Sequence, residues 1–219
     1  MIIPKLPDVP AFIPRGKVVL ATHNAKKLVE MRRLFEAAGL GLDVVGLDEF
    51  PDAPSPAETG RTFAENALIK AHAAVEATGL AAMADDSGIE VEVLNNMPGV
   101  RSARWAGPEG DDRANLELLL RQVDDVPAEQ RQARFVCAMA HVDPQGNELV
   151  TVGEWPGVLA SEPAGSNGFG YDPIFIPEGC EVTSAELSPE EKDSRSHRSR
   201  AVSAMITALQ SLASTPEES

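Results

Sequence analysis

The hydrophobic positions along the chain change repeatedly between the spacing of a strand and the spacing of a helix. Short apolar or alternating runs predict strands, and apolar residues that recur every three or four positions predict helices. We expect strands at 17–21, within 40–50, at 80–84, from 89, at 133–142, 148–154 and 157–160, and helices at 26–38, 62–78, 111–123 and after Arg198. The pattern contains no internal repeat and no linker between separately folded domains.

The predicted helix at 62–78 has two unlike faces. Its apolar face consists of Phe63, Ala67, Ala71 and Ala74. Asn66 and Lys70, four residues apart, share another face, and such a polar face is usually solvated. However, the chain has only six lysines against thirteen arginines, and four of those lysines fall in polar segments of interest. Because lysine binds phosphate as a compact point charge, a functional role for Lys70 stays open beside the solvated one.

Composition limits the classes of protein that the chain can represent. At 219 residues, of which 43% are hydrophobic, it can form a sizeable core in one domain or in two lobes. A net charge of -15 argues against binding to a nucleic acid polymer, which depends on many lysines and arginines. A single small anion remains a suitable ligand.

The termini and the cysteines predict a cytoplasmic protein that does not enter a membrane. No stretch reaches the roughly 18 consecutive apolar residues of a membrane span. Residues 1–16 contain four prolines and are predicted to be an extension, and residues 213–219 a polar tail, around a domain at 17–212. Cys137 and Cys180 lack the spacing of a metal motif and are expected to be reduced thiols.

Two adjacent carboxylates, Asp85 and Asp86, follow one apolar run and precede an alternating one, so we expect them where one strand ends and another begins. Neighbouring carboxylates repel, and a bound hard cation or a cationic side chain relieves that repulsion. The sequence Asp-Asp-Ser-Gly is also good turn chemistry. The four residues alone therefore indicate either a cation site or an acidic turn.

The segment Thr22 to Lys27 links a predicted strand to a predicted helix. Backbone amides, the positive end of the helix and a lysine would meet there, which is the geometry of an anion site. The alternative is an ordinary loop capped by Thr22 or Asn24. The segment lacks the glycines of a Walker motif.

A glycine-rich segment at 165–173 has aromatic residues between its glycines. Glycine permits close approach of the backbone, and an exposed ring beside it offers a platform on which a base can stack. The alternative is a flexible connector whose aromatic residues anchor it to the core. Further along, Ser188 and Glu191 form a second capping box, with proline at the first helical position, before Lys192 and the run Ser196-His197-Arg198.

Five segments, in this order and spacing, resemble the inosine triphosphate pyrophosphatase family, which removes non-standard purine nucleoside triphosphates. They are Thr22 to Lys27, Glu58 to Lys70, Ala84 to Gly107, Gly165 to Pro173 and Lys192 to Arg198. The resemblance extends over about 17–212. It implies an α/β fold with a long, twisted mixed sheet flanked by helices, two lobes around a central nucleotide-binding cleft, and a homodimer.

The resemblance also assigns roles to individual residues. It places Asp86 as general base and metal ligand, Glu58 as the second metal ligand, Lys70 as a catalytic lysine and Ser87 at the substrate. The triphosphate loop falls on Thr22, His23, Asn24, Ala25, Lys26 and Lys27. The purine cradle falls on Phe169, Gly170, Tyr171 and Asp172, and the residues that read the base on Lys192, His197 and Arg198.

The activity that the resemblance implies is Mg²⁺-dependent hydrolysis of ITP, dITP and XTP to the nucleoside monophosphate and pyrophosphate. Two departures from the family pattern, His23 and Arg101, make the entrance more basic. A sensor that binds a triphosphate without cleaving it and a Maf-type pyrophosphatase are the alternatives. The adjacent carboxylates argue against the sensor, and the Ser-His-Arg run argues against the Maf-type enzyme.

Overall fold

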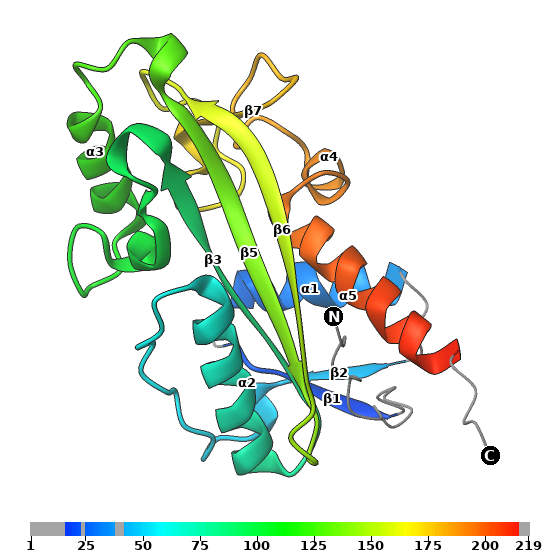
Figure 1. The fold of residues 1–219 in the computed structure, drawn as a ribbon. Coiled ribbons are helices and arrows are strands. Elements are labelled where there is room, and N and C mark those ends of the chain that lie inside the picture. Colours follow the sequence, from blue (N-terminus) through cyan, green and yellow to red (C-terminus); the bar gives the residue numbers. More distant parts are fainter. Residues whose placement is uncertain (1–15, 23–24, 38–41, 215–219) are drawn as a thin grey trace, which may run out of the picture.

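A mixed sheet runs through the protein (Figure 1). The structure is a computed structural model that describes residues 16–22, 25–37 and 42–214. In these residues the sheet has seven strands, in the order β2-β1-β3-β5-β6-β7, with β4 paired to β3. Its strands are β1 (Lys17–Leu20), β2 (Asp43–Gly46), β3 (Ala82–Val91), β4 (Met97–Pro98), β5 (Gln132–Val142), β6 (Glu148–Leu159) and β7 (Phe175–Pro177). Strand β1 is parallel to β2 and β3, whereas the other pairs are antiparallel.

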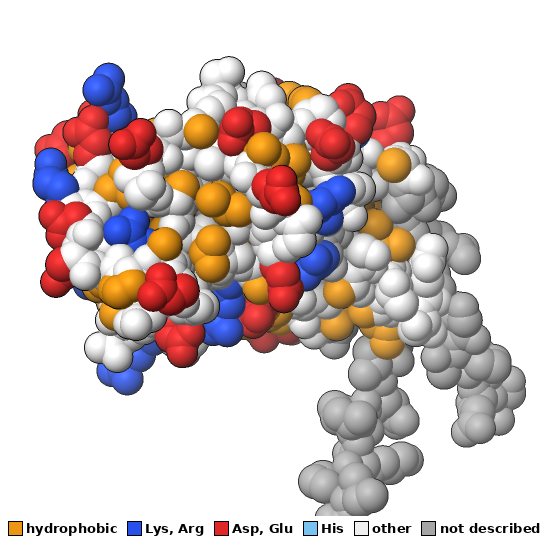
Figure 2. Space-filling view, turned by 90° about the horizontal axis from the view of Figure 1, so that it is seen from above, with side chains coloured by type: hydrophobic (Ala, Val, Ile, Leu, Met, Phe, Trp, Pro, Cys, Tyr) orange, Lys and Arg blue, Asp and Glu red, His pale blue; other side chains and the backbone are white. Residues whose placement is uncertain are grey.

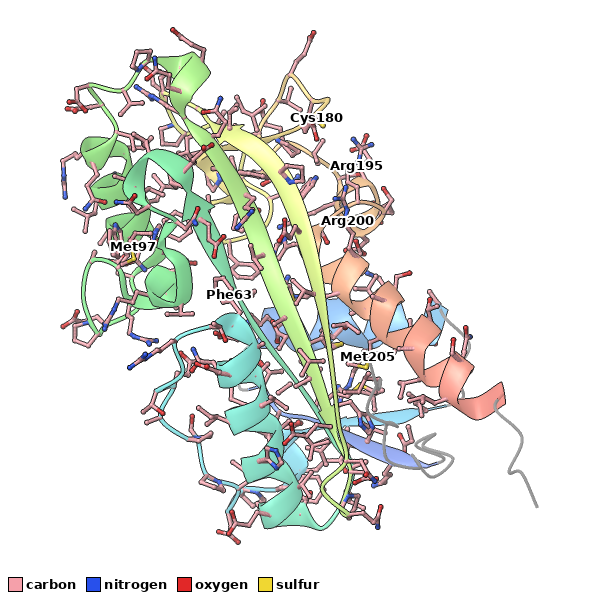
Figure 3. All side chains as sticks on the ribbon, in the orientation of Figure 1. Phe63, Met97, Cys180, Arg195, Arg200 and Met205 are labelled. Atoms are coloured by element: carbon pink, nitrogen blue, oxygen red, sulfur yellow. The ribbon has the colours of Figure 1, made fainter. Side chains whose placement is uncertain are left out.

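Helices cover both faces of this sheet. They are α1 (Ala25–Ala37), α2 (Phe63–Thr78), α3 (Asp112–Gln122), α4 (Pro189–Asp193) and α5 (His197–Ser214). Short 3-10 turns lie at Leu47–Glu49, Glu92–Leu94, Gly99–Arg104, Ala128–Gln130 and Asp172–Ile174. Helix α2 packs on one face of the central strands, and α1 and α5 pack on the other. Figure 3 shows this arrangement, with Phe63 on the α2 side and Met205 on the α5 side.

The long strands β3, β5 and β6 connect two lobes. The lower lobe in Figure 1 holds β1, β2 and α2, and the upper lobe holds α3 and β7. A separate apolar cluster, which includes Leu119, Trp155 and Phe175, forms the core of the upper lobe. The α/β fold expected from the sequence, with a twisted mixed sheet and two lobes, is therefore confirmed.

Two of the predicted strand boundaries are wrong. Asp85 and Asp86 lie inside the single strand β3 instead of at a junction, because β5 pairs with every residue from Ala82 to Val91. Likewise 148–154 and 157–160 belong to the one strand β6, which continues through Pro156. Proline breaks a run in sequence, but pairing with β5 along its whole length keeps β6 continuous.

Smaller differences follow from packing. The alternating run ends at Val91, because Glu92–Leu94 forms a 3-10 turn that leaves Val93 exposed. In α5 the buried positions are Ala201, Val202, Met205 and Leu209, whereas Ala208 and Leu212 are only partly buried. The apolar face of α2 is buried as predicted. The division at 16 and 213 stays a prediction.

The sheet leaves part of β3 unpaired on one edge. Strand β1 pairs with Ala82 and Met83, and β4 pairs with Glu90 and Val91. Within the described residues no strand pairs with that edge of β3 in between. This opening in the sheet lies between the lobes, beside Asp85, Asp86 and Ser87 in the middle of β3.

Candidate functional site

A cleft of about 620 Å³ lies at the opening beside β3. Residues from both lobes line it, including every predicted site residue whose side chain the structure describes. These are Thr22, Lys27, Glu58, Lys70, Asp86, Ser87, Phe169, Gly170, Tyr171, Asp172, Lys192, His197 and Arg198. Of the other predicted residues, His23 and Asn24 lie outside the described residues, as do the side chains of Ala25 and Lys26.

The two adjacent aspartates serve opposite faces of the sheet. Side chains alternate along a strand, so Asp86 faces α2 together with Ala82 and Ala84, whereas Asp85 follows Met83 toward α1 and α5. The opening beside β3 lets both carboxylates reach the cleft. Asp86 pairs with Lys70, whereas Asp85 pairs with Lys27 and Arg198. These different cationic partners relieve the repulsion between the two neighbouring carboxylates.

On the α2 side, Asp86 contacts two residues that lie one helical turn apart. Asn66 Nδ2 donates to Asp86 Oδ2 at 3.1 Å, and Lys70 Nζ donates to Asp86 Oδ1 at 2.9 Å. Lys70 Nζ also donates to Glu58 Oε1 at 3.2 Å, and Arg104 Nη1 to Glu58 Oε2 at 2.8 Å. Asn66 is completely buried and the Lys70 side chain is only 16% exposed. The interpretation of this helix face as solvated is therefore wrong.

Burial and charge act differently on these groups. Burial raises the pKa of Asp86, and Lys70 offsets only part of that effect. Burial also raises the pKa of Glu58, but the combined effect of Lys70 and Arg104 is larger and opposite. The pKa of Glu58 therefore lies below its ordinary value. For Lys70 the carboxylates outweigh burial and raise its pKa. Lys70 is thus firmly charged, whereas the pKa values of Asp86 and Glu58 move in opposite directions from their ordinary values.

On the opposite face, the buried carboxylate of Asp85 has several cationic neighbours. Lys27 Nζ lies 2.8 Å from Asp85 Oδ2, and Arg198 Nε lies 3.7 Å from the same oxygen. Arg198 Nη2 donates to Ser87 Oγ at 3.2 Å. Burial alone would raise the pKa of Asp85, but Lys27 and Arg198 hold it well below its usual range. One ionised carboxylate therefore links α1, which follows the predicted phosphate loop, to α5.

The glycine-rich segment is held in place by hydrogen bonds. Asp172 Oδ2 accepts from Lys192 Nζ at 2.5 Å and from the Phe169 amide at 2.9 Å, and Asp172 Oδ1 accepts from Ser184 Oγ at 2.7 Å. In addition, the Gly170 amide donates to Asp112 Oδ2 at 3.0 Å. The segment is thus tied to α3 and α4, and it is a structured part of the cleft.

The Phe169 ring lies beside two cations. Its centroid is 5.7 Å from Lys192 Nζ and 5.8 Å from Arg198 Cζ. The ring is partly exposed and lines the cleft. By contrast, Tyr171 is buried, and its hydroxyl donates to the Ser102 carbonyl at 2.8 Å. Phe169 is therefore the aromatic residue of this segment that offers a ring at the cleft, whereas Tyr171 anchors the segment to the core.

His197 begins α5 at the back of the cleft. Its ring stacks on Phe135, with centroids 4.8 Å apart and planes 14° apart. Burial lowers the pKa of His197 well below its ordinary value, and Arg198 and Lys192 lower it further. A neutral imidazole therefore lies beside the two cations at this end of the cleft.

The sequence predictions assigned no role at the site to several residues that shape it. Asn66 and Arg104 contact the carboxylates, and Asp112 and Ser184 hold the glycine-rich segment. For Asn66 a signal exists, since an asparagine near the start of an alanine-rich helix is a poor helix former. For Arg104, Asp112 and Ser184, the partners are far away in sequence, and no local pattern connects them.

Comparison with known proteins agrees with this site and fold. An α/β sheet that opens onto a cleft with lysines at paired carboxylates and an aromatic ring beside two cations defines a nucleotide-binding class of protein. The model of the Ham1 family matches residues 18–208, and the chain belongs to this family. A curated relative from Cutibacterium acnes, named dITP/XTP pyrophosphatase, is 58% identical over 89% of this chain and 96% of its own.

Solved structures give the same result. The crystal structure of a nucleoside-triphosphatase, or dITP/XTP pyrophosphatase, from Mycobacterium abscessus is 53% identical, with a TM-score of 0.73 over 88% of this chain and 99% of that one. The structure of a HAM1 protein from Coxiella burnetii is 40% identical, with a TM-score of 0.82 over 90% of this chain and all of that one. Among the residues that the structure describes, no helix is long and apolar enough to cross a bilayer.

Proposed function

We propose that this protein hydrolyses non-canonical purine nucleoside triphosphates, namely ITP, dITP and XTP, to the nucleoside monophosphate and pyrophosphate. The observation that carries the proposal is the division of the cleft into two ends. At one end Lys70 pairs with Asp86 and Glu58, and at the other the Phe169 ring lies beside Lys192 and Arg198. These two ends suit a polyphosphate and a planar base, respectively. The names of relatives above 50% identity support the same activity.

A divalent cation fits the carboxylate end. Asp86 Oδ1 and Glu58 Oε1 converge on one cationic group, the Lys70 ammonium, so the two oxygens already share a position for positive charge. The described residues contain no group of three or more metal-binding side chains, and substrate and water oxygens must complete the coordination, as is usual for Mg²⁺. When bound by Asp86 and Glu58, Mg²⁺ would polarise the α-phosphate and neutralise developing charge.

The side chains of the protein have separate parts in this reaction. Asp86, whose pKa burial raises, accepts a proton from the water that attacks the α-phosphorus. The bond from the α-phosphorus to its bridging oxygen breaks as the new bond forms, and pyrophosphate leaves. Lys27 and Lys70 neutralise the negative charge on the phosphates. These local cations are necessary because the net charge of -15 repels a polyanionic substrate. On the upper face of the molecule, acidic and basic side chains are interspersed (Figure 2).

At the other end, Arg198 and Lys192 present donors, which match the 6-oxo group of hypoxanthine or xanthine and oppose the 6-amino group of adenine. Phe169 offers its ring to the base. Hydrogen bonds to a substrate can discriminate by about 10⁴-fold, because a mismatched base leaves buried polar groups without partners. We expect ATP to be a poor substrate for this reason.

A panel of nucleoside triphosphates tests the proposal. We expect pyrophosphate release from ITP, dITP and XTP in the presence of Mg²⁺, with kcat/KM far above the value for ATP. Binding of ITP without any release of pyrophosphate would instead show a sensor.

Two further expectations stay predictions: that the protein is a homodimer and that it acts in the cytoplasm. Sedimentation of the purified protein tests the first of them.

A further inference from the structure

Asn66 is completely buried on α2 and makes hydrogen bonds on both sides of its amide group. Asn66 Nδ2 donates to Asp86 Oδ2 at 3.1 Å, and Asn66 Oδ1 accepts from the Gly60 amide at 2.8 Å. Buried polar atoms cost free energy unless they are paired, and here both ends of the amide are used. The side chain therefore connects the strand that carries Asp86 to the loop before α2.

The bond to Asp86 decides how that carboxylate is oriented. With Oδ2 engaged by Asn66, the other oxygen, Oδ1, faces Lys70 and lies on the side of Glu58. A hydrogen bond at one oxygen restricts rotation of the carboxylate about its last bond. Asn66 thus holds the plane of the Asp86 carboxylate so that its second oxygen faces Lys70, which also pairs with Glu58.

The bond to Gly60 acts on the second carboxylate. Gly60 follows Glu58 by two residues, so its amide ties the loop that carries Glu58 to the same amide group that holds Asp86. Glycine is needed for this approach, because a Cβ at position 60 would lie 2.7 Å from Asn66 Oδ1. Asparagine also costs helix stability relative to alanine, which fills much of α2.

We propose that Asn66 is a positioning residue for the reaction, which holds Asp86 and Glu58 in register so that together they bind the divalent cation. This inference rests on the proposed function. Side chains that orient metal ligands typically change metal affinity or activity by about 10–100-fold when they are removed. Asparagine suits the role because one amide group supplies both a donor and an acceptor.

Two variants remove the bonds of Asn66. Asn66→Ala shortens the side chain, whereas Asn66→Leu keeps about its size without a donor or an acceptor. We expect both variants to lose about 10–100-fold in kcat with dITP and in Mn²⁺ affinity, measured from the electron paramagnetic resonance signal of free Mn²⁺. The KM for dITP should change by less than about threefold, since the base end and Lys27 are untouched.

Thr62→Ala is the matched control for a loosened helix. Thr62 Oγ1 accepts from the Glu65 amide in the capping box of α2, one turn before Asn66, and does not contact either carboxylate. We expect this variant to unfold at a lower temperature with unchanged kcat and Mn²⁺ affinity. Wild-type kcat and Mn²⁺ affinity in Asn66→Leu would overturn the proposal, as would equal losses in Thr62→Ala. A wild-type protein that releases no pyrophosphate would overturn the proposed function instead, while the Mn²⁺ titrations would still decide the role of Asn66.

Discussion

Lys70 Nζ lies 2.9 Å from Asp86 Oδ1, and the same ammonium reaches Glu58 Oε1 at 3.2 Å. A helix residue thereby forms ion pairs with two carboxylates that come from a loop and from the middle of a strand, and Arg104 supplies a second cation to Glu58. Because the three groups lie at the open edge of the sheet, this charge balance is accessible from the cleft. Substitutions of Asp86, Lys70 and Arg198 test, respectively, the acid-base, electrostatic and recognition roles of the site.

Asp86→Asn tests the acid-base role. The change keeps the shape of the side chain but removes its basicity and one negative charge at the proposed cation site. We expect kcat with dITP to fall by at least about 10²-fold, the usual scale for loss of a general base. Near-normal turnover at saturating Mg²⁺ would show that another group accepts the proton.

Lys70→Met tests the electrostatic role, because methionine keeps much of the length of the side chain without its charge. We expect kcat/KM for dITP to fall, and the unfolding free energy to fall by about 1–3 kcal/mol, because Asp86 loses a charged hydrogen bond in a largely buried site. Added Mg²⁺ should raise the melting temperature of this variant more than that of the wild type, since the cation can replace the ammonium.

Lys17→Met is the control for Lys70→Met. Lys17 forms an exposed ion pair with Glu49, at 3.4 Å, and an exposed pair contributes at most about 1 kcal/mol. We expect unchanged kcat and no extra response to Mg²⁺. If Lys70→Met matches Lys17→Met in its kinetics and in its response to Mg²⁺, then Lys70 has no part in the reaction.

Arg198→Ala tests recognition of the base. We expect kcat/KM for ITP and XTP to fall by about 10–100-fold, the scale of a hydrogen bond to a charged group, and that for ATP to fall much less. The measured quantity is the ratio of kcat/KM for ITP to kcat/KM for ATP in each protein. Arg198 also pairs with Asp85, so a general loss of stability would lower all values together. An unchanged ratio would therefore assign Arg198 to the phosphates or the fold.

His141 predicts how stability depends on pH. Burial lowers the pKa of His141 to about 4, with Asp143 offsetting part of the effect, so the unfolded chain takes up a proton before the folded one does as pH falls. The contribution of His141 is complete above its unfolded pKa of about 6.5 and is lost between there and about 4, at no more than about 1.4 kcal/mol per pH unit.

Urea unfolding at pH 7, 6 and 5 measures this dependence in the wild type and in His141→Phe, which keeps a ring without a titrating group. We expect the unfolding free energy of the variant to fall less steeply with decreasing pH. Parallel curves for the two proteins would mean that His141 takes up its proton equally in both states.

Local sequence patterns predicted most of the elements but not their limits. The breaks expected at 85–88 and at 155–156 do not exist, because whether a strand continues depends on its neighbours, and β5 pairs with both strands across these positions. Similarly, Val93 fits an alternating pattern and is nevertheless exposed, since a 3-10 turn ends β3 before it.

The sequence indicated which residues gather at the cleft better than it indicated what they contact. Lys70 was found from its place on a helix face, but its position between Asp86 and Glu58 depends on how α2 packs against β3. Asp172 was expected at the purine, yet its carboxylate is occupied by Lys192, Ser184 and the Phe169 amide. Such contacts join residues far apart in the chain, and only the fold brings them together.

The products formed from dITP test the central claim most directly. Wild type and Asp86→Asn are incubated with dITP and Mg²⁺, and the nucleotides and phosphates are separated and quantified. Attack at the α-phosphorus predicts dIMP and pyrophosphate in equal amounts from the wild type, and greatly reduced amounts of both from Asp86→Asn. Formation of dIDP and orthophosphate, or equal product from both proteins, would contradict it.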